Sequence, residues 1–106
     1  TLVEAAGCEP SRRCLGRSLW PVLREPGQSL REYQLSEVCH ADRHIMIRSC
    51  RHKYVVDQHA RGYMLFDLEK DPTEQNNLIL GGGGDALERD LREKLLARLV
   101  EAQYRM

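Results

Sequence analysis

The chain has 106 residues, of which 42% are apolar and 30% charged, a balance typical of one small globular domain. Its 16 basic and 16 acidic residues cancel, so no sequence-wide positive field exists to attract nucleic acid or an anionic membrane. No apolar run approaches the ~20 residues of a membrane span. The four cysteines are too few and too scattered for a disulfide scaffold, so we expect free thiols, although an exported protein would leave two bridges open. They are Cys8, Cys14, Cys39 and Cys50.

Residues 1–31 are interpreted as a helix remnant followed by a connector. The stretch 1–7 has the composition of the last turns of a helix that Gly7 closes. There is no signal peptide and no initiator Met, so we expect that the chain was cut from a longer protein. Residues 8–31 are rich in Pro, Gly and Arg, which predicts an irregular connector anchored by Leu19 and Trp20.

Residues 32–106 are predicted to form an α+β domain. β-Branched and aromatic runs within residues 32–68 are separated by short polar links, which favour antiparallel pairing because parallel strands need a long crossover. We therefore predict an antiparallel sheet of about four strands. The expected strands are 33–38, 45–48, 54–57 and 63–68.

A turn and a glycine hinge over residues 69–84 lead to a predicted helix over 85–106. Asp71-Pro72 ends the sheet because Pro cannot donate to a strand ladder. Asp85 could cap the helix, with Glu88 completing a capping box. One apolar stripe is expected to pack on the sheet, and Glu88/Arg92 and Asp90/Lys94 are favourable i,i+4 pairs. The stripe comprises Leu87, Leu91, Leu95 and Leu99, widened by Leu96 and Val100.

Three segments in this order resemble the C-terminal end of sulfatases, in the alkaline phosphatase superfamily. In that family a helix ending in "TLL-LAG" leads to "G-S-LLPLL", an "R-KY" hairpin, a "LYDL-DP-E-NNL" strand and turn, and a closing helix. The third segment is the most specific, and its Asp, Pro, Glu and Asn residues can form a hydrogen-bonded turn. The segments are 1–7 with 16–23, then 45–55, then 65–78, and the motif residues are Asp67, Asp71, Pro72, Glu74 and Asn77.

The resemblance implies that the intact protein is a sulfatase, a hydrolase of sulfate esters. It implies a formylglycine made from Cys or Ser, and one Ca²⁺ or Mg²⁺ among oxygen ligands. Those residues belong to an upstream catalytic domain, so this chain alone is predicted to be inactive, to pack on that domain and to help shape the substrate cleft. Glu37 and His40, which end the first strand, could border the substrate pocket; a solvent-facing polar role is the alternative for both.

Cys8-Glu9-Pro10-Ser11-Arg12 matches the C-x-P-S-R phrase in which sulfatases make formylglycine. We interpret it as a surface loop, because the phrase lies between the segments that resemble "LAG" and "G-S-L". No room follows it for a catalytic domain, and short motifs often match by chance.

Two other groupings carry less specific signals. Cys39, His40, His44, Cys50 and His52 include enough soft ligands for zinc. Only His40 and His44 have the spacing of a zinc-ligand pair, and no second pair accompanies them. The basic run Arg48, Arg51, His52 and Lys53 has only one neighbouring aromatic residue, which is unlike a nucleic-acid site.

Two alternatives remain open. The chain could be a free-standing interaction module that uses its sheet or helix to bind a partner, or the C-terminal domain of a related phosphonate or phosphate ester hydrolase. Exposed apolar surface is expected in every case, and self-association of the isolated chain is possible.

Overall fold

The computed structural model describes residues 1–9, 11–12, 16–39, 41–82 and 84–104. The chain divides into two units: Tyr33–Arg98 form one, and Thr1–Glu32 with Leu99–Met106 form the other. The domain boundary predicted after residue 31 stays a prediction. No described helix is both long enough and apolar enough to cross a membrane.

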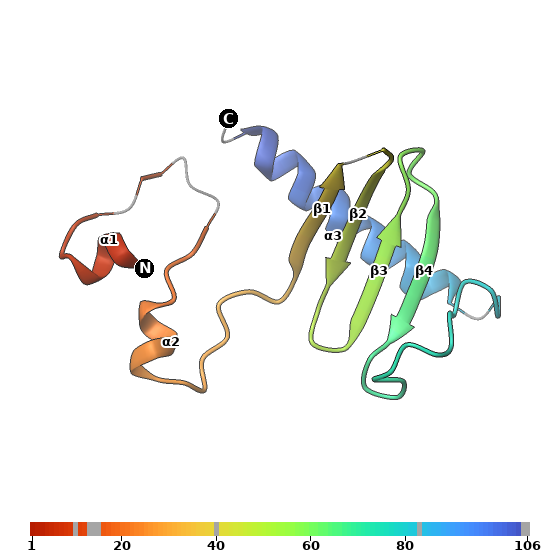
Figure 1. The fold of residues 1–106 in the computed structure, drawn as a ribbon, viewed down its shortest axis with the longest axis horizontal. Helices are drawn as coiled ribbons and strands as arrows, with labels where there is room; N and C mark the ends of the chain where they lie inside the picture. Colours follow the sequence, from red (N-terminus) through yellow and green to blue (C-terminus); the bar gives the residue numbers. More distant parts are fainter. Residues whose placement is uncertain (10, 13–15, 40, 83, 105–106) are drawn as a thin grey trace. The chain divides into compact units, whose positions relative to one another are not determined.

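The larger unit contains a four-stranded antiparallel meander in the order β1-β2-β3-β4 (Figure 1). Each strand pairs with the next one along the chain because the connections are too short for a crossover. The predicted α+β class and the predicted sheet are both confirmed. The strands are β1 (Gln34–Cys39), β2 (Arg43–Arg48), β3 (His52–Val56) and β4 (Gly62–Asp67).

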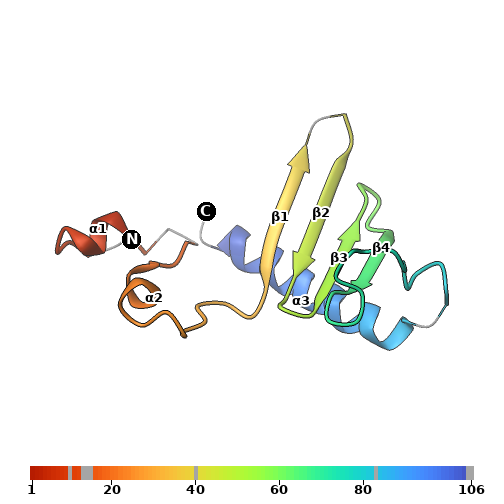
Figure 2. The same cartoon turned by 60° about the horizontal axis from the view of Figure 1, so that its bottom comes forward.

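Helix α3 (Asp85–Tyr104) covers one face of this sheet with its residues 85–98, as Figures 1 and 2 show. The strand register places Ile47, Tyr54 and Leu65 directly opposite one another on three neighbouring strands, and all three are 0% exposed. The helix contributes Leu91 and Leu95, which are 1% and 7% exposed. The core of the domain therefore lies between α3 and this one face of the sheet.

Two details of the predicted helix are wrong. Asp85 is the first helical residue, and the carbonyl of Gly84 accepts the first helical hydrogen bond, from the Glu88 N–H at 2.7 Å. The Glu88 side chain is turned toward the sheet, so no capping box forms. Leu96 and Val100 do not widen the buried stripe, since they are 60% and 48% exposed.

The β3–β4 connection is a tight polar turn. The Asp57 carboxylate accepts hydrogen bonds from the backbone N–H groups of His59 and Arg61, at 2.8 and 2.9 Å. These bonds hold the pKa of Asp57 below its ordinary value, with the Arg61 N–H making the largest contribution. Ala60 sits in the left-handed region at φ 60°, which costs free energy for a residue with a Cβ.

The smaller unit contains two short helices, α1 (Leu2–Ala5) and α2 (Trp20–Arg24), and neither has a buried residue. Gly7 closes α1 as predicted: its φ is 78°, and the N–H of Cys8 bonds back to the carbonyl of Val3 at 3.0 Å. The predicted connector, residues 8–31, contains the short helix α2. Pro21 is compatible with this helix because it lies in the first turn, where its missing N–H costs nothing.

Candidate functional site

The turn after β4 begins at Asp67, whose carboxylate is fully engaged. One oxygen accepts the backbone N–H groups of Glu69 and Lys70 at 3.1 and 3.3 Å. The other accepts from the Arg51 guanidinium, with Nη2 at 3.2 Å. The hydrogen bond from Arg51 is the main reason why the pKa of Asp67 lies below its ordinary value. Asp67 thus ties this turn to the β2–β3 connection.

Asp71 organises the next part of the same turn. Its two carboxylate oxygens accept the backbone N–H groups of Gln75 and Asn76, at 3.0 and 2.8 Å. Glu74 lies in the left-handed region at φ 57°, and its carboxylate pairs with the Lys53 ammonium on β3 at 2.8 Å. Pro72 is exposed on this turn.

Asn77 attaches the end of the turn to strand β4. Its side-chain oxygen accepts the N–H of Leu65 at 3.1 Å, and its amide nitrogen donates to the carbonyl of Tyr63 at 2.7 Å. The N–H of Leu78 then bonds to the carbonyl of Leu65 at 2.9 Å. Asn77 therefore satisfies backbone groups at the outer edge of β4 that would otherwise lack partners.

The structure describes one of the two predicted pocket-rim residues. Glu37 on β1 forms an ion pair with Arg43 on β2, and their side chains are 36% and 57% exposed. His40 lies outside the described residues. Their role at a substrate pocket stays a prediction.

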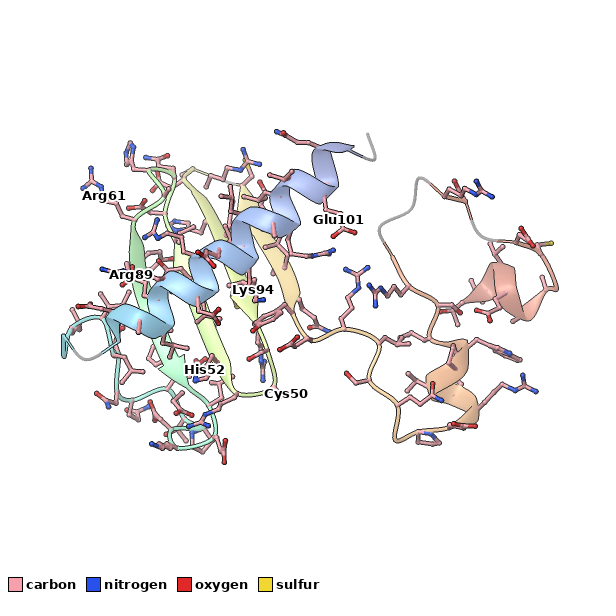
Figure 3. All side chains as sticks on the ribbon, turned by 180° about the vertical axis from the view of Figure 1, so that it is seen from behind. Cys50, His52, Arg61, Arg89, Lys94 and Glu101 are labelled. Atoms are coloured by element: carbon pink, nitrogen blue, oxygen red, sulfur yellow. The ribbon has the colours of Figure 1, made fainter. Side chains whose placement is uncertain are left out.

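The cysteines and histidines considered for zinc do not converge. Cys39 and His44 flank the β1–β2 connection, whereas Cys50 and His52 flank the β2–β3 connection at the opposite end of the sheet (Figures 1 and 3). Among the described residues, no group of three or more His, Cys, Asp and Glu side chains could hold a metal ion.

The cysteine side chains that the structure describes are exposed free thiols: Cys8, Cys39 and Cys50. Of the phrase considered for formylglycine, Pro10 lies outside the described residues. The basic run contains two charges that are already paired, because Arg51 contacts Asp67 and Lys53 contacts Glu74.

A polar network at the sheet–helix interface was not predicted from the sequence. The Tyr54 hydroxyl donates to Glu88 at 2.9 Å and accepts from Arg92 at 3.0 Å. Arg92 also donates to the carbonyl of Ala60 at 2.6 Å, so the network links β3, α3 and the β3–β4 turn. Burial, reinforced by the bond to Glu88, raises the pKa of Tyr54 to about 12. In the sequence, the only indication of this network was the i,i+4 spacing of Glu88 and Arg92.

Solved structures of sulfatases are similar to almost the whole chain. At 27% identity and a TM-score of 0.84, 97% of the chain matches BT1596, a 2-O GAG sulfatase. A putative sulfatase from Bacteroides thetaiotaomicron matches the same share at 26% identity and a TM-score of 0.84. BT4656, solved with D-glucosamine-2-N,6-O-disulfate as its substrate, matches 99% at 25% identity and a TM-score of 0.72.

The chain spans only 24%, 24% and 22% of the lengths of these three proteins. No family model and no curated protein matches it. The meander with its single long helix and the three sulfatase structures support the assignment of this chain as a sulfatase C-terminal domain.

Proposed function

We propose that this chain is the non-catalytic C-terminal part of a longer sulfatase that hydrolyses sulfate esters. The proposal rests on one observation: at a TM-score of 0.84, nearly the whole chain matches a sulfatase of which it covers only 24%. The polar residues of its most specific motif support a structural role, since the carboxylates of Asp67 and Asp71 are engaged by backbone N–H groups or by Arg51.

The longer protein is proposed to supply both the formylglycine and one Ca²⁺ or Mg²⁺, which would stabilise charge on the sulfate group. The described residues of this chain do not fit such a cation, because no cluster of potential ligands forms among them. We therefore assign no catalytic step to this chain.

The proposed tasks of the chain are to pack on the catalytic domain and to help shape the substrate cleft. Glu37 and His40 are the proposed rim residues. Glu37 is about one-third exposed, and its charge is balanced by Arg43, so it could give up this exposed ion pair at little cost.

The test is hydrolysis of an aryl sulfate by the 106-residue chain and by the intact protein, each with and without Ca²⁺. We expect activity from the intact protein only. An intact protein that cleaves phosphonate or phosphate esters and leaves sulfate esters untouched would refute the sulfatase assignment, and activity of the chain alone would refute its non-catalytic role.

The rim role is tested separately in the intact protein. Glu37→Gln should raise KM and leave kcat nearly unchanged, because a rim residue contributes binding that is equal in the ground state and the transition state. Glu69→Gln is the matched control, since Glu69 is 70% exposed and lies in the turn after β4. Equal KM values for the two variants would remove Glu37 from the rim.

A further inference from the structure

The sheet has a second face that α3 does not cover, called the open face below. Antiparallel partners point to the same side of a sheet, so the register assigns each residue to a face. Tyr54 points to α3, because its hydroxyl contacts Glu88 and Arg92. Its neighbours along and across the strands therefore point away from α3. The open face comprises Gln34, Ser36, Val38, His44, Met46, Arg48, Lys53, Val55, Met64 and Phe66.

The centre of the open face is apolar. Met46, Val55 and Met64 lie directly opposite one another on β2, β3 and β4. Val55 is 7% exposed, whereas Met64 is 37% exposed and Val38, on the outer strand, is 58% exposed. The β3–β4 register shifts between Val55 and Val56, so Tyr63 does not follow the strict alternation of faces. Tyr63 is 36% exposed and extends this apolar surface, because its ring packs edge-on against His44 at 5.4 Å. A contiguous apolar patch with a polar rim is typical of an interaction surface.

One end of the open face, where β2 leads into β3, is basic. Arg48 and Lys53 lie directly opposite each other, and the Glu74 carboxylate balances only Lys53. Arg48 is exposed, with no ion-pair partner among the described residues. An occupant of this face must therefore bring apolar surface together with acidic or neutral groups opposite Arg48.

We infer that the open face docks on the catalytic domain of the longer protein; this inference rests on the function proposed above. Two observations favour that occupant. The sulfatases that match this chain are about four times as long, so most of each one lies outside the matched part. A second copy of the chain would present the same open face, whose strand residues include no carboxylate to pair with Arg48 and whose neighbouring Glu74 is already paired with Lys53.

The first test measures the oxidation of Met46 and Met64 by hydroxyl radicals, which modify exposed thioethers. We expect both residues to be oxidised readily in the 106-residue chain and several-fold more slowly in the intact protein. Denatured intact protein gives the fully exposed reference rate. Equal rates in the chain and in the folded intact protein would overturn the inference, as would slow oxidation in a chain that elutes as a dimer.

The second test reverses a charge. In the 106-residue chain, Arg48→Glu should leave Tm unchanged or raise it, because the change removes a like-charge pair with Lys53. In the intact protein the same variant should lower the temperature at which activity is lost. Arg89→Glu, at an exposed position of α3, is the matched control and should change neither value. A lower Tm of the 106-residue chain carrying Arg48→Glu, or an unchanged inactivation temperature of the intact variant, would contradict the docking of this face.

The third test introduces a charge at apolar positions. Met64→Glu should destabilise the intact protein more than it destabilises the 106-residue chain, whereas Leu96→Glu, at a position that is 60% exposed, should have a similar effect in both. Circular dichroism of both variants in the 106-residue chain checks that the sheet still forms. An effect of Met64→Glu that is equal in the 106-residue chain and in the intact protein would contradict the inference.

These results separate the two proposals. If the intact protein is an active sulfatase and its Met46 and Met64 are fully oxidised, the proposed function is supported and the docking of the open face is contradicted. If the intact protein lacks sulfatase activity and both residues are protected, the proposed function is contradicted and the docking of the open face is supported.

Discussion

The two units of the chain differ in how they are stabilised. In Tyr33–Arg98, eight apolar side chains are buried, and they come from three strands and a helix. Among the described residues of 1–32, none is buried, and the two helices there have four and five residues. Helices that short are unstable in water without tertiary contacts.

The side-chain hydrogen bonds that join distant parts of the N-terminal segment are exposed. Thr1 accepts the N–H of Leu19 at 2.7 Å, and Arg17 donates to the carbonyl of Leu30 at 2.5 Å. Exposed bonds exchange with water and add little net stability. The comparison teaches that the sheet–helix unit can hold its shape by apolar burial, whereas residues 1–32 need support that their own side chains do not supply.

The largest effect is expected from the buried face of α3. Leu91→Ala should lower the free energy of unfolding by about 2–5 kcal/mol, because Leu91 is 1% exposed and truncation leaves a cavity. Chemical denaturation of the 106-residue chain measures this change. Leu96→Ala, on the exposed side of the same helix, is the control and should cost less than about 0.5 kcal/mol. Similar costs for the two variants would mean that α3 does not cover the sheet as described.

The next effect concerns the turn after β4. Asn77→Ala should cost about 1–3 kcal/mol, since the N–H of Leu65 and the carbonyl of Tyr63 lose their side-chain partners. Asn76→Ala is the matched control, because only the backbone N–H of Asn76 is used in the turn, by Asp71. Hydrogen exchange at Leu65 should accelerate in the first variant alone. Unchanged exchange there would show that Asn77 does not hold this edge.

The strands and the helix were predictable because each has a local signal, whereas the contacts between them were not. Leu91 and Leu95 follow from a four-residue repeat. Leu96 points elsewhere because it lies about 100° further round the helix than Leu95. The Tyr54–Glu88 bond joins residues 34 positions apart, so it depends on how α3 crosses the sheet.

The same limit applies to the candidate site. The spacing of Asp67, Asp71 and Asn77 indicated a turn, but the partners Arg51 and Tyr63 come from other elements that only folding brings close. Patterns of apolar residues predict elements and faces, while polar contacts between distant elements require the three-dimensional arrangement.

The polar network around Tyr54 should make stability depend on alkaline pH. The pKa of Tyr54 is raised from 10.0 to about 12, so the folded state favours the neutral phenol. Its contribution to stability is complete below pH 10 and is lost as the pH rises toward about 12. Denaturation measured across this range should show a decline in wild type that is smaller in Tyr54→Phe.

At neutral pH, Tyr54→Phe should itself cost about 1 kcal/mol, because Glu88 loses a hydrogen-bond donor. Tyr63→Phe is the control for the alkaline decline, since Tyr63 is partly exposed. An alkaline decline of equal size in wild type and Tyr54→Phe would show that other groups cause it.

A smaller effect, of opposite sign, is expected at the β3–β4 turn. Ala60→Gly should stabilise the chain by about 0.5–1 kcal/mol, because glycine adopts the left-handed conformation of Ala60 without strain. The same substitution at Ala97, an exposed position of α3, should destabilise by about 1 kcal/mol. The sign of the difference in Tm between the two variants checks both statements, and destabilisation by both would place Ala60 outside the left-handed region.

The smallest effect is expected in the N-terminal segment and tests the comparison directly. Leu2→Ala and Leu23→Ala should each change the free energy of unfolding of the 106-residue chain by less than about 0.5 kcal/mol, since these side chains are 85% and 66% exposed. In the intact protein, the same substitutions should be costly if the catalytic domain covers these leucines. A large cost in the 106-residue chain would reveal a core in residues 1–32 and remove the contrast between the two units. Negligible costs in both proteins would instead show that these two leucines bind no catalytic domain.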